Sequence, residues 1–187
     1  MRACLSFWIA LALTASPAVD PRAAAVTHKL DIIQSGKAKP GAVFVITAAE
    51  LNAWARLKAP QVVPEGFRQP HIALGNNSAN GFALIDFLKV RHGAGIETNW
   101  LLAKLIQGEK PVKVSARFRS ANGRATVFLE RVEIGGLAVS GATLDFLIRT
   151  FFLPLYPNAK INEPFDLADR IDRIDVTPAD VRIYIKK

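Results

Sequence analysis

The sequence predicts an α+β domain with a curved, mainly antiparallel sheet and two or three helices packed on one face. Several short segments alternate apolar and polar residues with a period of two, which is typical of half-buried strands. Other segments are apolar at helical spacing and end at glycine or proline. Half of the 187 residues are hydrophobic and 21% are charged, which excludes an intrinsically disordered chain.

The N-terminal residues have the pattern of a secretory signal peptide. A basic start precedes an uncharged stretch over residues 3–15, which is too short to span a bilayer. Small residues suit cleavage after Ala18 or after Ala25. We therefore expect a signal peptide at 1–25 and a single domain at 26–187. The protein would be periplasmic or extracellular, or membrane-anchored if the segment is not cleaved.

The first half of the domain contains one strong helix start. Thr47 and Glu50 form a capping box, in which each side chain satisfies the other residue's backbone N–H, and Pro60 is expected to prevent the helix from continuing. The expected elements are a linker over 26–39, a strand over 42–46, a helix over 47–58, strands over 70–75 and 81–90 joined by a long loop, and a helix over 99–107.

The second half contains the clearest strand pair. Asn122 and Gly123 both tolerate positive φ and predict a tight hairpin turn, while Glu130 and Arg131 interrupt the alternation and indicate a bulge. Ser140 is expected to cap the following helix. The expected elements are strands over 112–119 and 125–134, a strongly apolar helix over 140–153, and a last hairpin over 171–185.

One face of the strand over residues 112–119 is cationic. Lys113, Arg117 and Arg119 alternate with apolar residues there, and the whole chain carries a net charge of +8. We expect these three side chains to contact anionic head groups on a membrane surface. The alternative is a solubilising outer face. We do not expect nucleic acid as a partner, because the chain has no aromatic and basic recognition motif.

The residue types that carry enzyme chemistry are not grouped in recognisable motifs. The histidines lack metal-ligand spacing, so we expect no metal and no cofactor. The surroundings of Ser140 depart from the esterase pattern because Ala138 replaces its glycine. Cys4 is the sole cysteine and would be lost with the signal peptide. We therefore expect no catalytic residue; a hydrolase built from scattered residues is an alternative.

The order of the elements resembles a family of bacterial envelope proteins. An apolar strand runs into the Thr-x-x-Glu-Leu-Asn helix start at residues 47–52, paired strands follow, and a terminal strand pair surrounds Ile174 and Val181. This layout, over residues 42–185, resembles the small exported or anchored proteins of the YpmS type, which are similar to tubular lipid-binding (TULIP-like) domains. The resemblance implies a curved antiparallel sheet that holds helices around an apolar groove, and it implies no catalytic residue.

These observations predict an exported, non-enzymatic binding module that holds a lipid or another apolar ligand between the sheet and a helix. The residues expected to line this groove are Trp100, Leu144, Leu147, Ile148, Phe151 and Phe152. The alternative is a solid core without a groove, filled by Trp100, Phe146, Phe151, Phe152 and Leu155. A different function is an envelope interaction or structural module that docks to a protein complex through the basic strand face or the Phe-rich segment.

Overall fold

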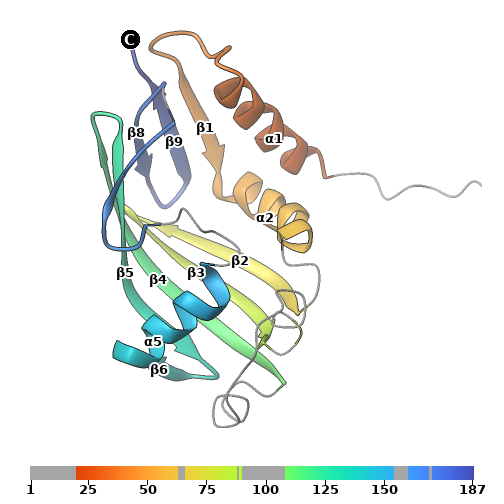
Figure 1. Ribbon diagram of the computed structural model, residues 1–187. Helices are drawn as coiled ribbons and strands as arrows, with labels where there is room; N and C mark the ends of the chain where they lie inside the picture. Colours follow the sequence, from red (N-terminus) through yellow and green to blue (C-terminus); the bar gives the residue numbers. More distant parts are fainter. Residues whose placement is uncertain (1–19, 63–65, 88, 90–107, 154–159, 169) are drawn as a thin grey trace, which may run out of the picture.

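The structure is a computed structural model that describes residues 20–62, 66–87, 89, 108–153, 160–168 and 170–187. It confirms the α+β prediction, with helices packed on antiparallel strands (Figure 1). The elements are α1 (Pro21–Gln34), β1 (Val43–Thr47), α2 (Ala48–Val62), β2 (Phe67–Gly75), β3 (Ser78–Asp86), β4 (Glu109–Ala121), β5 (Arg124–Ile134), β6 (Leu137–Val139), α5 (Gly141–Leu147), η1 (Ile148–Phe152), β7 (Pro164–Asp166), β8 (Ile171–Val176) and β9 (Asp180–Ile185).

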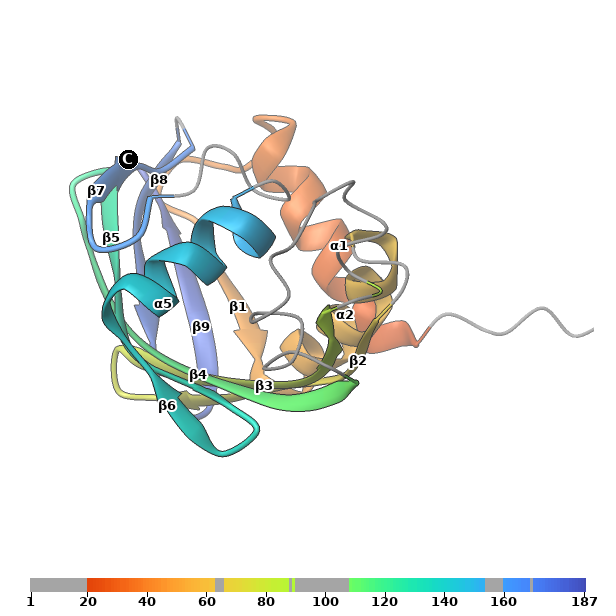
Figure 2. The same ribbon diagram turned by 60° about the horizontal axis from the view of Figure 1, so that its bottom comes forward.

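The strands in the described part of the chain form two sheets, whereas the sequence predicts a single one. The smaller sheet has the order β1-β9-β8, and the larger sheet has the order β2-β3-β4-β5-β6, with β7 also paired to β5. All strand pairs are antiparallel. Figure 2 shows the larger sheet curving so that α5 lies on its inner side.

The first helix contradicts the prediction of a linker over residues 26–39. The α1 helix begins at Pro21, and the Asp20 side chain caps it by accepting a hydrogen bond from the Arg22 N–H at 2.9 Å. Its buried residues are Ala23, Val26 and Ile33, which lie along one helix face. An Asp-Pro helix start and this apolar spacing outweigh the mixed composition of the segment. The predicted domain start at residue 26 therefore falls inside α1.

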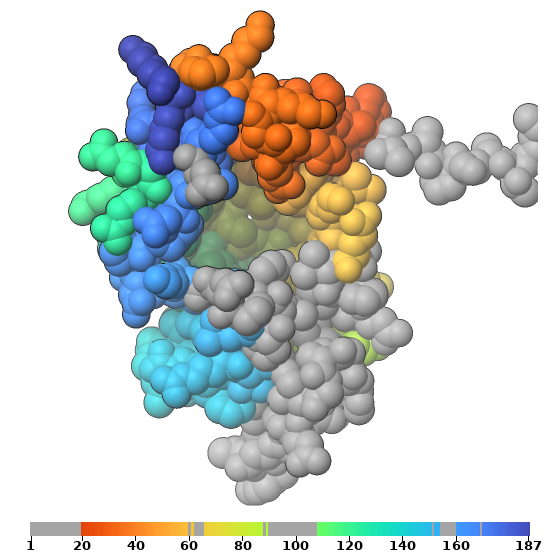
Figure 3. All heavy atoms as spheres, turned by 45° about the horizontal axis from the view of Figure 1, so that its top comes forward, coloured from red at the N-terminus to blue at the C-terminus, as the bar shows by residue number. Residues whose placement is uncertain are grey.

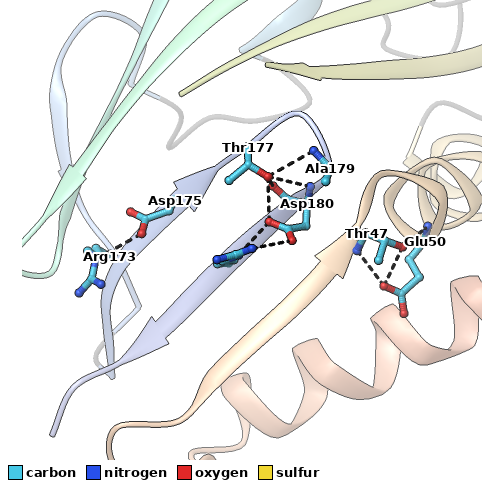
Figure 4. A network of polar contacts seen from close by, with 8 residues as sticks. Thr47, Glu50, Arg173, Asp175, Thr177, Ala179 and Asp180 are labelled. Carbon is cyan, nitrogen blue, oxygen red and sulfur yellow. Dashed lines mark hydrogen bonds and ion pairs between the residues drawn. The ribbon is translucent and has the colours of Figure 1, made fainter. Parts of the chain in front are cut away.

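The capping box at the start of α2 is confirmed. The Thr47 N–H donates to Glu50 Oε2 at 2.8 Å, and the Glu50 N–H donates to Thr47 Oγ1 at 3.2 Å (Figure 4). Partial burial raises the pKa of Glu50, but hydrogen bonds from Lys29 and Thr47 outweigh it, so the pKa lies below its usual value. The expected stop before Pro60 is wrong, because α2 continues to Val62. The fixed φ of proline is compatible with a helix. Because Pro60 lies near the C-terminal end of α2, its missing N–H costs one hydrogen bond and the helix continues for two more residues.

Asn52 joins α2 to the edge of the larger sheet. Its side chain amide is 8% exposed and donates to the carbonyls of Ala48 and Ile72, both at 2.8 Å. Its Oδ1 also accepts a hydrogen bond from the Ile72 N–H at 2.7 Å. The side chain thus satisfies both backbone groups that Ile72 presents at the open edge of β2, much as another strand would.

The inner face of the smaller sheet is closed by α1. Its buried cluster consists of Val26, Ile33, Ala38, Ile46, Ile171, Ile183 and Ile185. At the edge of β1, Lys29 of α1 donates to the Val45 carbonyl and to Glu50, both at 2.7 Å. A lysine in this position also hinders pairing with another strand. The terminal hairpin is confirmed, since Val181, Ile183 and Ile185 share the inner face of β9.

The hairpins of the larger sheet differ in how well they were predicted. The Asn122-Gly123 turn is confirmed by φ values of 53° and 76°, and the bulge at Glu130 is confirmed by a register shift between β4 and β5. The long loop expected after Gly75 is wrong, because Gly75 pairs directly with Ser78. Residues 78–80 also pair with β4. Backbone pairing with β2 on one side and β4 on the other outweighs the low strand propensity of these residues.

The helix predicted over 140–153 is divided into α5 and a π-helical turn, η1. Ser140 occupies the N-cap position of α5, but its side chain makes no capping hydrogen bond. The buried cluster beneath α5 consists of Phe87, Val112, Val132, Ile134 and Leu147. The helix predicted over 99–107 lies outside the described residues.

Backbone hydrogen bonds at the β2–β3 turn tie the two sheets together. The Asn77 N–H donates to the Val176 carbonyl of β8 at 2.9 Å, and the Asn77 carbonyl accepts from the Phe118 N–H of β4 at 2.7 Å. The Ile174 N–H of β8 donates to Ser120 Oγ of β4 at 2.9 Å. The smaller sheet is therefore held against one end of the β4–β5 hairpin.

Candidate functional site

An apolar pocket of about 330 Å³ lies between α2 and the inner face of the larger sheet. We call it the inner pocket. Residues from α2, β3 and β4 that line it include Trp54, Ala59, Ala83, Ile85, Val112 and Val114. Figure 3 shows the molecule hollowed beside α2, with atoms of the larger sheet at the floor.

The inner pocket exists because the sheet carries small residues opposite α2. Gly81 and Ala83 follow one another along the inner face of β3, and α2 contributes Ala55 and Ala59. Val112 belongs both to the pocket wall and to the cluster beneath α5. The pocket thus continues the apolar inner face of the sheet past the area that α5 covers.

Three side chains with polar groups, Lys58, Trp54 and His71, occur in this otherwise apolar lining. Lys58 is the charged side chain there, and its Nζ donates to Gln61 Oε1 at 3.2 Å. The indole Nε1 of Trp54 is buried and has no hydrogen-bond partner within the described part of the chain. A buried donor without an acceptor costs stability, so a ligand that places an acceptor atom beside Trp54 Nε1 would gain a hydrogen bond there.

The predicted groove residues lie beside this pocket and do not line it. Leu147 is 6% exposed in the cluster beneath α5, and Leu144 packs against the same cluster. Ile148 is half-buried and Phe152 is 37% exposed. These four are absent from the pocket wall. Trp100 and the side chain of Phe151 lie outside the described residues.

The cationic strand face is confirmed as an exposed surface. Lys113, Arg117 and Arg119 all project from the side of β4 opposite α5. Arg117 forms an ion pair with Glu130, and the Arg119 guanidinium lies 5.7 Å from the Phe128 ring centroid. Part of the predicted positive charge is therefore neutralised within the protein.

The described residues contain neither a cluster of His, Cys, Asp or Glu suited to hold a metal nor a helix long and apolar enough to cross a membrane. Searches against protein-family models, curated proteins and solved structures found no match to the chain.

Proposed function

We propose that this protein is a binding module that holds an apolar ligand in the inner pocket. The observation that carries the proposal is an apolar space of about 330 Å³ between Trp54 of α2 and Val112 and Val114 of the sheet. This volume is at the lower end of the roughly 300–1,000 Å³ typical of small-molecule sites. It suits one acyl chain or a compact apolar molecule better than a lipid with two chains.

The polar groups of the pocket narrow the class of ligand further. Lys58 offers a positive charge beside an apolar wall, as an amphiphile with an acidic head group requires. The resemblance to YpmS-type and TULIP-like proteins supports an apolar ligand, and the signal-like uncharged stretch over residues 3–15 supports export. The proposal assigns binding to the protein and no catalytic step.

Gly81 allows the pocket to be filled without disturbing its surroundings. Its φ is not positive, and a Cβ added there would meet only the Val114 carbonyl oxygen, at 4.0 Å. A valine should fit the backbone, since β-branched residues favour strands. The substitution Gly81→Val is therefore expected to occupy pocket space and leave the fold intact.

The experiment is native mass spectrometry with solvent extraction on protein from a membrane-containing host, after expression of the full chain. We expect the wild type to carry an apolar ligand at close to one-to-one stoichiometry and Gly81→Val to lose most of it. The control is Ala121→Val at the exposed end of β4, which should keep the ligand. An empty wild-type protein that takes up no lipid from envelope extract would contradict the proposal.

A protein-docking function is the second candidate. It is favoured by the apolar side chains of α5 and η1 that reach the surface, because Phe146 is 40% exposed and Phe152 is 37% exposed. The same measurement separates the two functions. An empty pocket in the wild type, together with loss of a copurifying protein in Phe146→Ser, would favour docking.

A further inference from the structure

The outer face of the larger sheet, opposite α5, carries a second pocket, of about 270 Å³. The strand register places its wall in two adjacent rows that cross β2, β3, β4 and β5. The first row is Ala73, Asn80, Ser115 and Arg131, and the second row is His71, Phe82, Lys113 and Glu133. Small side chains in the first row leave a depression between longer neighbours. We call it the outer pocket.

Hydrogen-bond donors dominate the outer pocket. Ser115 Oγ donates to Asn80 Oδ1 at 2.7 Å, which occupies the amide oxygen and leaves the amide nitrogen of Asn80 as a donor. Glu133 is the only carboxylate among the described residues of the wall, and it accepts a hydrogen bond from Arg131 Nε at 2.6 Å. The terminal nitrogens of Arg131 and the Lys113 ammonium therefore remain as donors for a ligand.

We propose that the outer pocket binds the phosphate group of an anionic phospholipid in a membrane. Three donors from adjacent strands, Asn80, Lys113 and Arg131, match the several acceptor oxygens of a phosphate. Phe82 supplies apolar contact for the glycerol end of the lipid. This site lies on the opposite face of the sheet from the inner pocket, and its function does not rest on the function proposed there. The residues that contribute to both walls are His71, Gly81, Phe82 and Val114.

The surroundings of the outer pocket favour a membrane over nucleic acid. Arg119 continues the cationic surface along β4 beyond Arg117, whose charge is offset by Glu130, so positive charge extends past the outer pocket. Sites for single-stranded nucleic acid present several rings for successive bases. Here the Phe128 ring is covered by Arg119, and the pocket wall contains one imidazole, His71, and one phenyl ring, Phe82, which are cross-strand neighbours.

The test uses protein from expression of the full chain and vesicle flotation. Vesicles of equal parts phosphatidylglycerol and phosphatidylcholine are compared with vesicles of phosphatidylcholine alone. We expect Lys113→Gln/Arg131→Gln to weaken the binding to anionic vesicles by about tenfold or more, because each basic residue near such a surface contributes about 1 kcal/mol. Lys113→Glu provides a second variant that leaves Arg131 and its partner Glu133 in place.

The control is Lys37→Gln/Lys39→Gln, which removes the same charge from exposed lysines between α1 and β1. It should bind within about twofold of the wild type if the site, and not net charge alone, is responsible. Equal losses in both double variants would overturn the proposal. Tighter binding to a single-stranded oligonucleotide than to the anionic vesicles would also overturn it.

Discussion

The two sheets differ in how their inner faces are filled. In the smaller sheet, four isoleucines at positions 46, 171, 183 and 185 pack directly against α1. In the larger sheet, valines and small residues dominate the inner face, and α5 and α2 cover separate parts of it. The first arrangement closes a core, whereas the second leaves the inner pocket. The smaller sheet therefore has a closed core, and the larger sheet has a pocket on each face.

The largest expected effect tests this difference in packing. Ile183 is 6% exposed between α1 and the smaller sheet, so Ile183→Ala should cost about 3–4 kcal/mol of unfolding free energy, as cavities in closed cores do. Leu147→Ala should cost about 2 kcal/mol, since α5 can settle onto the sheet beside an existing pocket. Urea unfolding measures both. Equal costs would show that the two regions are packed alike.

A smaller effect is expected where α2 meets the edge of the larger sheet. Asn52→Ala leaves both the N–H and the carbonyl of Ile72 without their partner, which should cost about 2 kcal/mol. Gln61→Ala on the same helix is the control, and as a surface change it should cost less than about 0.5 kcal/mol. If the urea midpoint of Asn52→Ala equals that of Gln61→Ala, the stability of the protein does not depend on the hydrogen bonds between Asn52 and Ile72.

The smallest effect concerns pH. Lys29 and Thr47 hold the pKa of Glu50 below its usual value in the folded protein, so Glu50 stabilises the fold at neutral pH and loses this effect as the pH falls through that lowered pKa. Glu50→Gln should therefore cost about 1 kcal/mol at pH 7 and less in acid. Thermal melts across the acid range test this. A difference from wild type that stays constant down to pH 3 would contradict it.

Locally encoded features of the fold were predictable from the sequence. The Thr47 capping box, the Asn122-Gly123 turn and the bulge at Glu130 each depend on a few neighbouring residues. The α1 helix was not predicted because its buried positions lie on both sides of the proposed cleavage site at Ala25. A signal peptide that ends there separates Ala23 from Val26 and Ile33 and hides the helical spacing. The end of α2 was misjudged because a proline weakens a helix without always ending it.

The candidate sites were harder to predict. The apolar segment around Leu147 indicated burial correctly, but hydrophobicity does not distinguish a groove wall from a packed core. The inner pocket depends on side chains that are small, at Gly81 and Ala83, opposite Ala59 from a distant helix. The cationic face of β4 was predictable from its period of two, whereas the outer pocket requires the register of four strands, which only the tertiary structure provides.

The pairing of β1 with β9 has a consequence for the order in which the chain folds. Residues 43–47 lie beside residues 180–185, so the smaller sheet joins segments from opposite ends of the sequence. Contacts between distant segments slow folding, because a long loop must close before they form. During synthesis α1 and β1 emerge early and can contact α2, whereas β9, the strand that pairs with β1, follows the β2–β5 meander in the chain. The smaller sheet can therefore close only after the β2–β5 meander, which carries both pockets, has been synthesised.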